Sequence, residues 1–274
     1  MNDIKVGLSP LLRWVGGKSW ISDVITAIYR HNGGGYYVEP FAGGLSCALT
    51  ALPENALIND INADLINLYE VIKDGAQFDF GKYASADYYA LRDRFNVVRK
   101  SGNPEDRYER AELFFVLNKL GYNGLIRYST RYNVPKGDKE LGVCADMATY
   151  ASFFADWKFE SVDFECLEIP SNSFVVIDSP YHDKFTRYWE TDFEESDQER
   201  CIQWAGSLQS KVILTNAATP YVISLLEKYG FSFVVLQKKY SVAAKAKGRK
   251  ARVQEVFAWK GVELSSEIKR MLKA

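Results

Sequence analysis

Short apolar runs alternate with glycine and polar residues near the start of the chain. A mostly apolar run over 36–39 enters a glycine turn at 40–44, and residues 46–52 have helical composition. A second apolar run over 56–60 ends on polar residues. This succession of strand, turn, helix and strand is typical of a parallel sheet with helices on its faces.

The middle of the chain has a helical pattern instead. Apolar residues that step by three and four predict a helix capped by Ser85: Tyr88, Leu91, Phe95 and Val98. A second helical run covers 105–120 and stops at Gly121. The residues on either side of Ser129 and Thr130 predict a hairpin near 121–137, closed by Pro135. We therefore expect a mainly helical module inserted into a sheet protein.

Strand patterns return after this module. Four further strands are predicted, the last two as an antiparallel pair: 174–178, 211–216, 231–237 and 253–259. Thr219 and Pro220 supply a cap and a first-turn proline for a helix that ends at Gly230. The predicted fold class is α/β, with a mostly parallel sheet, a C-terminal antiparallel strand and an inserted helical module.

Composition limits the class of protein. The chain has 274 residues, 47% hydrophobic and 25% charged, which suits a globular protein of one large or two small domains. Its four cysteines form no CxxC pair and only two histidines are present. We therefore expect no metal site, no disulfide framework and a cytoplasmic location. Because no apolar run of about 18 residues and no signal-peptide pattern occurs, no membrane partner is expected.

Charge gives a local indication of nucleic acid. The formal net charge is −1, but the stretch 238–252 holds seven Lys or Arg residues and no acid. Such a stretch suits phosphate contacts, and it is equally compatible with a solvated loop.

A glycine turn follows the first predicted strand, in the segment Glu39-Pro40-Phe41-Ala42-Gly43-Gly44. Glycine allows a close approach of the backbone to a ligand, and the following helix offers free amides. Asp60 ends the next strand about 20 residues later, where an acid can bind ribose hydroxyls. Neither the GxGxxG fingerprint nor a P-loop occurs in the sequence. The pattern favours an adenosine-containing cofactor, and a plain turn is the alternative.

Two further segments carry groups suited to chemistry. Asp178-Ser179-Pro180-Tyr181 ends a buried strand, where the carboxylate can accept a hydrogen bond from an amine and the tyrosine can stack. Arg13-Trp14-Val15-Gly16-Gly17-Lys18 combines a tryptophan, a glycine pair and two cations, which suits a loop around a ligand. Taken alone, the first is equally a strand ending in a proline turn, and the second a surface segment.

Together, these segments resemble the Dam-type (alpha-group) DNA adenine methyltransferases. Motifs of that family occur here in the family's order: WxGGK at 14–18, EPFxGxGS (here EPFAGGLS) at 39–46, NDxNxxL at 59–65, GYNGLxRY at 121–128, NVPxG at 133–137 and FTxY at 185–188. The resemblance covers nearly the whole chain. It implies a Rossmann-like catalytic domain formed by 1–66 and 155–274, and a target-recognition domain formed by 67–154.

The resemblance implies methyl transfer from S-adenosylmethionine to the exocyclic amine of an adenine flipped out of duplex DNA. In the family's DPPY motif, the aspartate and the carbonyl of the second residue accept the amine hydrogens, and the aromatic residue stacks on the base. The matching catalytic residues are Asp178, Ser179, Pro180 and Tyr181. Ser179 departs from the family's proline. It keeps the carbonyl but loses the stiffness, so we expect an active enzyme, slowed if anything.

The resemblance also assigns binding residues. Those implied for the cofactor, with Asp60 on the ribose, are Trp14, Lys18, Glu39, Pro40, Phe41, Gly43, Asp60, Asp163, Phe164 and Asp178. Those implied for DNA are Arg13, Tyr122, Asn123, Leu125, Arg127, Pro135, Lys245, Lys247, Arg249 and Lys250. Arg127 is the expected guanine reader, because bidentate arginine to guanine is the commonest specific base contact.

The target site is GATC by resemblance alone, and the same resemblance implies a monomeric, prokaryotic or phage-encoded enzyme. Two alternatives stay open: a DNA-binding protein of the same fold that Ser179 has impaired, and a methyltransferase acting on the exocyclic amine of cytosine. Methylation of a cytosine ring carbon is excluded, because it needs a cysteine after a proline and none occurs. The sequence does not distinguish a restriction–modification enzyme from an orphan chromosomal one.

Overall fold

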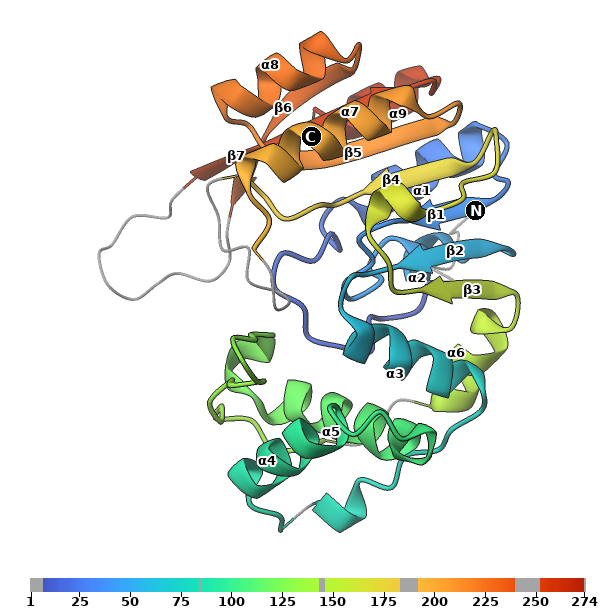
Figure 1. Cartoon of the computed structure of the whole chain (residues 1–274). Helices are drawn as coiled ribbons and strands as arrows, with labels where there is room; N and C mark the ends of the chain where they lie inside the picture. Colours follow the sequence, from blue (N-terminus) through green and yellow to red (C-terminus); the bar gives the residue numbers. More distant parts are fainter. Residues whose placement is uncertain (1–6, 84, 143–145, 183–191, 240–251, 274) are drawn as a thin grey trace.

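The computed structural model describes residues 7–83, 85–142, 146–182, 192–239 and 252–273. Within these residues, seven strands form one sheet in the order β3-β2-β1-β4-β5-β7-β6 (Figure 1). Their bounds are β1 Tyr37–Glu39, β2 Ala56–Asn59, β3 Trp157–Glu160, β4 Phe174–Ile177, β5 Lys211–Ala217, β6 Ser232–Lys239 and β7 Arg252–Lys260. The strands from β3 to β5 pair in parallel, and β7 is antiparallel to both of its neighbours. The predicted α/β class is confirmed.

Helices flank the sheet on both faces. Their bounds are α1 Ser22–His31, α2 Ala48–Ala51, α3 Ala63–Lys73, α4 Tyr88–Val98, α5 Arg107–Leu120, α6 Met147–Phe154, α7 Glu195–Ser207, α8 Pro220–Lys228 and α9 Ser266–Met271. Figure 1 shows α4 and α5 beyond α3, at the opposite end of the molecule from α8. None of the helices in the described ranges is both long and apolar enough to cross a membrane.

Successive residues of the central strands enter two different cores. In β4, Phe174 and Val176 belong to the core that α1, α3 and α9 share, whereas Val175 and Ile177 belong to the core of α7 and α8. Successive side chains of a strand point to opposite faces of a sheet. Because both faces are covered, these strands read as continuous apolar runs in the sequence.

Most predicted elements form where the pattern places them. β1 and β2 pair in parallel, β6 and β7 pair antiparallel, and the side chain of Thr219 caps α8. The predicted cap of α4 was wrong. Asp87, not Ser85, accepts the N–H of Ala90 at 3.0 Å, because Asp87 directly precedes the first helical residue.

The 121–137 loop follows α5 and forms no regular strand in the part of the chain that the structure describes. Two isolated antiparallel bridges, Gly121 with Lys136 and Tyr128 with Tyr132, hold its arms together instead of the ladder of a regular hairpin. Its buried tyrosines pack into the same core as α3 and α5. The loop is therefore fixed by packing more than by strand pairing.

Candidate active site

A cavity of about 580 Å³ lies at the carboxyl ends of β1, β2 and β4. Its walls include segments that are far apart in the sequence: 14–18, 39–44, 59–61, 162–164 and 178–181. Open α/β sheets bind ligands at this edge, and the volume is that of a small-molecule site. The fold therefore gathers the candidate cofactor and catalytic segments in one place.

Trp14 lies against the glycine turn after β1. A Cβ added to Gly43 would stand 2.6 Å from the indole Nε1 of Trp14, and one on Gly44 would stand 2.8 Å from the Trp14 Cβ. Gly43 also has a φ of +47°, which favours glycine. The hydroxyl of Tyr69 donates to the Gly43 carbonyl at 2.6 Å. The turn therefore needs glycine both for its backbone and for the indole beside it.

Asp60 follows β2 and accepts two backbone amides. The N–H of Gly43 and the N–H of Asn62 each donate to one of its oxygens at 2.9 Å. Burial raises the pKa of Asp60 to about 6, and these amide hydrogen bonds oppose the rise. The carboxylate is mostly ionised at neutral pH, and it is suited to accept the hydroxyls of a ribose.

Glu39 ends β1 and is only 4% exposed. It accepts the hydroxyl of Tyr37 at 2.8 Å. Burial raises the pKa of Glu39 to about 8, although the hydrogen bond from Tyr37 lowers it in part. A carboxyl group with this pKa is mostly neutral at pH 7 and ionises when a cation comes close. Glu39 can therefore become a negatively charged part of the cavity wall when a cationic ligand binds.

Asp163 and Phe164 form another wall of the cavity. Arg200 on α7 donates to both oxygens of Asp163, at 2.8 and 3.0 Å. Burial acts to raise the pKa of Asp163, but the hydrogen bonds from Arg200 and a backbone amide hold it below its ordinary value. The ring of Phe164 lies 5.4 Å from that of Phe41, measured between centroids. An aromatic surface beside an ionised carboxylate suits a purine with an amino group.

Asp178 is the first residue after β4. The Nζ of Lys18 lies 2.5 Å from its Oδ1, and the hydroxyl of Thr215 donates to the same oxygen at 3.1 Å. The side chain of Lys18 is only 4% exposed, so water screens this ion pair little. Burial raises the pKa of Asp178, and the ammonium of Lys18 opposes the rise.

Tyr181 is held at both ends of its side chain. The Nζ of Lys18 lies 4.6 Å from the ring centroid, and the hydroxyl donates to Glu255 on β7 at 2.9 Å. The carbonyl of the preceding Pro180 accepts the amide of Gln198 at 2.5 Å. An oriented aromatic ring therefore stands next to the Asp178 carboxylate.

The hydroxyl of Ser179 is buried between β5 and α7. Asn216 donates to it at 3.3 Å and to Gln198 at 2.9 Å. The side-chain oxygen of Asn216 accepts the N–H of His182 at 3.1 Å. Asn216 therefore contacts the 178–181 segment directly at Ser179 and holds the residue that follows it.

Among the described residues, four outside the predicted site hold this segment in place: Gln198, Thr215, Asn216 and Glu255. A signal exists for Thr215 and Asn216, because they end the predicted buried strand over 211–216, and Asp60 and Asp178 likewise stand at the ends of predicted strands. Gln198 and Glu255 lack such a signal. They reach the segment only through the packing of α7 and the pairing of β7 with β5.

Arg13 joins the cavity segments to the 121–137 loop. Asn118 on α5 accepts the N–H of Arg13 at 2.9 Å and donates to its carbonyl at 2.8 Å. Gly124, with a φ of +66°, leaves no room for a side chain, since an added Cβ would stand 2.3 Å from the Arg13 Cβ. The guanidinium of Arg13 donates to the carbonyl of Lys119 at 3.2 Å.

The structure places Tyr122, Asn123, Leu125 and Pro135 together in the 121–137 loop, outside the walls of the cavity. Tyr122 is 51% exposed, and Asn123 is exposed with a left-handed φ of +53°. Leu125 is half-buried against the core, and the carbonyl of Pro135 accepts the N–H of Tyr122 at 2.9 Å.

Arg127 is half-buried in the same loop. Its Nε donates to the side chain of Asn133 at 2.6 Å, and one terminal nitrogen donates to the Asn133 carbonyl at 2.9 Å. These two bonds to Asn133 hold one edge of the guanidinium and so orient the group. The remaining DNA candidates and the FTxY motif lie outside the described residues: Lys245, Lys247, Arg249, Lys250 and 185–188.

Comparison with known families gives a match over residues 14–242 to the D12 class N6 adenine-specific DNA methyltransferases. The match includes the cavity segments from Trp14 to Tyr181 and the whole 121–137 loop. The chain belongs to this family. It is therefore an adenine-specific DNA methyltransferase, its substrate is DNA, and its methyl donor is S-adenosylmethionine.

Curated DNA adenine methylases align with most of this D12 methyltransferase. That of Haemophilus influenzae is 30% identical over 281 residues, which cover 91% of this chain and 92% of that protein. The retron Ec67 DNA adenine methylase of Escherichia coli is 28% identical, with 93% and 92% covered. The DNA adenine methylase of Salmonella typhi is 32% identical over 238 residues, with 76% and 80% covered.

A solved structure of a candidate RNA methyltransferase from Pyrococcus horikoshii superposes on this chain with a TM-score of 0.43. It has 9% sequence identity and covers 90% of this chain and 89% of its own. A likeness this distant carries no functional information.

The cavity of this D12 enzyme fits the methyl donor chemically. S-adenosylmethionine carries ribose hydroxyls, a cationic sulfonium and a purine with an amino group. Asp60 offers a carboxylate for hydroxyls, Glu39 a charge that a cation can induce, and Asp163 with Phe164 an acceptor beside an aromatic face. The volume of about 580 Å³ also accommodates a molecule of that size.

Proposed function

We propose that this enzyme methylates the exocyclic amine of an adenine that is flipped out of duplex DNA, within the sequence GATC. The observation that carries the proposal is the shared cavity: Asp178 and Tyr181 line the same 580 Å³ space as Asp60 and Glu39. A site for the methyl donor and a site for a planar amine therefore adjoin each other.

Asp178 and the Ser179 carbonyl would activate the adenine amine. Its lone pair is delocalised into the ring, which makes it a poor nucleophile. When both N–H groups donate to these acceptors, the nitrogen is drawn towards tetrahedral geometry and the lone pair is released. The acceptors are fixed before the base arrives, so they act through positioning and electrostatics.

Lys18 and Tyr181 would support this pair of acceptors. The ammonium of Lys18, 2.5 Å from Asp178, favours the ionised carboxylate against burial. Tyr181, with its hydroxyl bonded to Glu255, offers a ring on which the flipped base can stack. An amine inside the duplex is out of reach of both acceptors, which is why flipping is part of the proposal.

The methyl donor would be held by the other cavity walls. We assign Asp60 to the ribose, Asp163 and Phe164 to the adenine, and the methionine end to the remaining wall residues: Trp14, Lys18, Glu39, Pro40, Phe41 and Gly43. When bound there, S-adenosylmethionine supplies an electrophilic methyl group.

The 121–137 loop would read the DNA. The exposed Tyr122 and Asn123 are suited to enter the duplex together with Leu125, next to Pro135, and Arg127 is suited to bond guanine. In this assignment Arg13 also contacts the DNA, and 67–154 form the recognition domain between catalytic parts 1–66 and 155–274. Phosphate contacts are assigned to Lys245, Lys247, Arg249 and Lys250, and the active species to the monomer.

Methyl transfer from labelled S-adenosylmethionine to matched duplexes with and without GATC tests the proposal, with nucleosides identified by mass spectrometry. We expect N6-methyladenine from the GATC duplex alone. N4-methylcytosine would identify a cytosine amine as the target. Absence of product, with binding of both donor and duplex retained, would identify an impaired protein of the same fold.

A further inference from the structure

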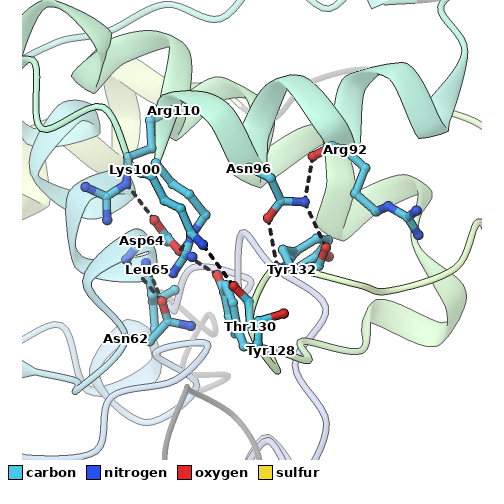
Figure 2. Close-up of polar contacts among 11 residues, drawn as sticks. Asn62, Asp64, Leu65, Arg92, Asn96, Lys100, Arg110, Tyr128, Thr130 and Tyr132 are labelled. Carbon is cyan, nitrogen blue, oxygen red and sulfur yellow. Dashed lines mark hydrogen bonds and ion pairs between the residues drawn. The ribbon is translucent and has the colours of Figure 1, made fainter.

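A single buried carboxylate joins the 121–137 loop to the turn that carries Asp60. Asp64, in the first turn of α3, has no solvent exposure. Its Oδ2 accepts the Nε of Arg99 at 3.0 Å and the hydroxyl of Tyr128 at 2.7 Å, and its Oδ1 accepts the Nε of Arg110 at 2.5 Å. Figure 2 shows Arg110 and Tyr128 reaching Asp64 from different elements.

Burying the charge of Asp64 costs free energy, so its hydrogen-bonding partners must all be in place around it. A buried carboxylate is tolerated only when charged and hydrogen-bonding partners surround it. Arg99 follows α4, Arg110 belongs to α5 and Tyr128 belongs to the 121–137 loop. Three separate parts of the inserted segment must therefore meet at one point of α3.

Tyr128 is the residue next to Arg127. It is 1% exposed, its ring meets that of Tyr132 edge-on at 5.4 Å, and the guanidinium of Arg99 lies 4.8 Å from its centroid. The hydroxyl bond to Asp64 fixes the depth at which this ring sits. Because Arg127 directly precedes Tyr128, the position of Tyr128 constrains the backbone of Arg127, whose carbonyl also accepts the N–H of Asn133 at 3.2 Å.

The second arm of the loop, which includes Thr130 and Tyr132, is held in another way. Asn96 on α4 bonds both the N–H and the carbonyl of Tyr132, at 2.8 and 2.9 Å, and Lys100 donates to the carbonyl of Thr130 at 3.0 Å (Figure 2). These bonds hold backbone groups. Asp64, by contrast, holds the arm that carries Arg127 through a side chain.

On its other side, Asp64 is bound to the cofactor turn. The side chain of Asn62 caps α3 by accepting the N–H groups of Asp64 and Leu65, at 3.1 and 3.2 Å. The N–H of Asn62 donates to Asp60, which also accepts the N–H of Gly43. One short turn of chain thus places the proposed ribose acceptor and the anchor of Tyr128.

We infer that Asp64 is a positioning residue for target discrimination. It holds Tyr128 and thereby fixes the position of Arg127 relative to the cavity. The inference rests on the proposed function, since it takes Arg127 as the guanine reader. It predicts that loss of the Asp64–Tyr128 bond relaxes discrimination at the guanine while the methyl-transfer site itself stays intact.

Tyr128→Phe is the primary test, because it removes only the hydroxyl and keeps the buried ring. The ratio of kcat/KM on the matched duplex to that on a duplex with the guanine replaced should fall about three- to tenfold, the value of one such hydrogen bond. Tyr132→Phe is the matched control. Its hydroxyl is equally buried but lies beside Tyr88 and not on Asp64, so its removal should leave the ratio unchanged.

A double-mutant cycle separates positioning from general loosening of the fold. If Tyr128 acts through Arg127, Tyr128→Phe should cause no further loss of discrimination in an Arg127→Ala background. An equal loss in both backgrounds, or an unchanged ratio in the single variant, would overturn the inference. Asp64→Asn should reproduce the phenotype; if it does not fold, the cycle with Tyr128→Phe decides.

The same data separate this inference from the proposed function. An unmutated enzyme that treats the two duplexes alike would show that Arg127 does not read the guanine, and both would fall together. An unmutated enzyme that discriminates, beside a Tyr128→Phe variant that discriminates equally well, would overturn only the role of Asp64. Fluorescence anisotropy with both duplexes gives the ratio of their dissociation constants, which reports discrimination independently of turnover.

Discussion

Asn216 donates a hydrogen bond to the hydroxyl of Ser179 at 3.3 Å. This contact ties the second residue of the 178–181 segment to the end of β5. The same Asn216 amide reaches Gln198, which donates to the Pro180 carbonyl at 2.5 Å. Proline, the family's residue at this position, is stiff by itself. Here a buried and connected set of side-chain bonds restrains the backbone instead.

Replacement of Ser179 by alanine should therefore be mild. Ser179→Ala loses a buried hydrogen bond worth about 1 kcal/mol of unfolding free energy but keeps the carbonyl that would accept the amine. We expect kcat to fall by less than about tenfold, whereas Asp178→Ala should lower it by roughly 10²–10³-fold. Single-turnover rates and thermal melts measure both. A folded Ser179→Ala variant as inactive as Asp178→Ala would show that the hydroxyl itself takes part in the reaction.

Lys18→Met should shift the pH dependence of the reaction. The ammonium opposes the effect of burial on Asp178, so its removal raises the pKa of that carboxyl further. The acid limb of the kcat profile should move to higher pH, with the largest rate loss on the acidic side. Rates measured across that limb test this. Lys228→Met is the control. Lys228 is exposed and pairs with Glu199 on α7, so its replacement should leave the pH profile unchanged.

Glu39→Gln should change how stability depends on pH. The pKa of Glu39 rises from 4.5 to about 8 on folding, so the folded protein binds the additional proton between these values. Its contribution is fully present below pH 4.5 and is lost as the pH rises through about 8. Glutamine can still accept the Tyr37 hydroxyl but does not titrate. The Tm of the ligand-free variant should therefore decline less between pH 5 and pH 8 than that of the unmutated enzyme; parallel declines would contradict the burial of Glu39 as a neutral acid.

Arg127→Ala should relax discrimination at one guanine by about 1–3 kcal/mol in transition-state binding. Arg131→Ala serves as the control in the same loop, because Arg131 is exposed and its nearest acid, Asp93, lies 3.9 Å away. Relative kcat/KM on duplexes substituted one base pair at a time provides the measurement. If both variants lose affinity for every duplex alike, Arg127 contacts phosphate and not a base.

Local signals in the sequence predicted several parts of this structure. Apolar runs identified six of the seven strands in the described residues, since both faces of the sheet are covered there, and Thr219-Pro220 identified the start of α8. β3 was not predicted, because the exposed Lys158 stands between its buried Trp157 and Phe159. The Ser85 cap was wrong, because several polar residues precede α4 and only the final backbone geometry selects Asp87. The 121–137 loop reads as a hairpin, yet α4 and α3 hold its arms, and the arms join each other through isolated bridges and the bonds of Arg127 to Asn133 in place of a regular ladder.

The sequence by itself determined the acids at strand ends and the glycine turn, because the carboxyl ends of parallel strands share one edge and a positive φ favours glycine. Only the tertiary structure decided which side chains meet there. The contacts of Lys18 with Asp178, Asn216 with Ser179 and Tyr128 with Asp64 join residues 160, 37 and 64 positions apart. Strand order and helix packing create such contacts, and no pattern along the chain encodes a pair that becomes adjacent only when the sheet assembles.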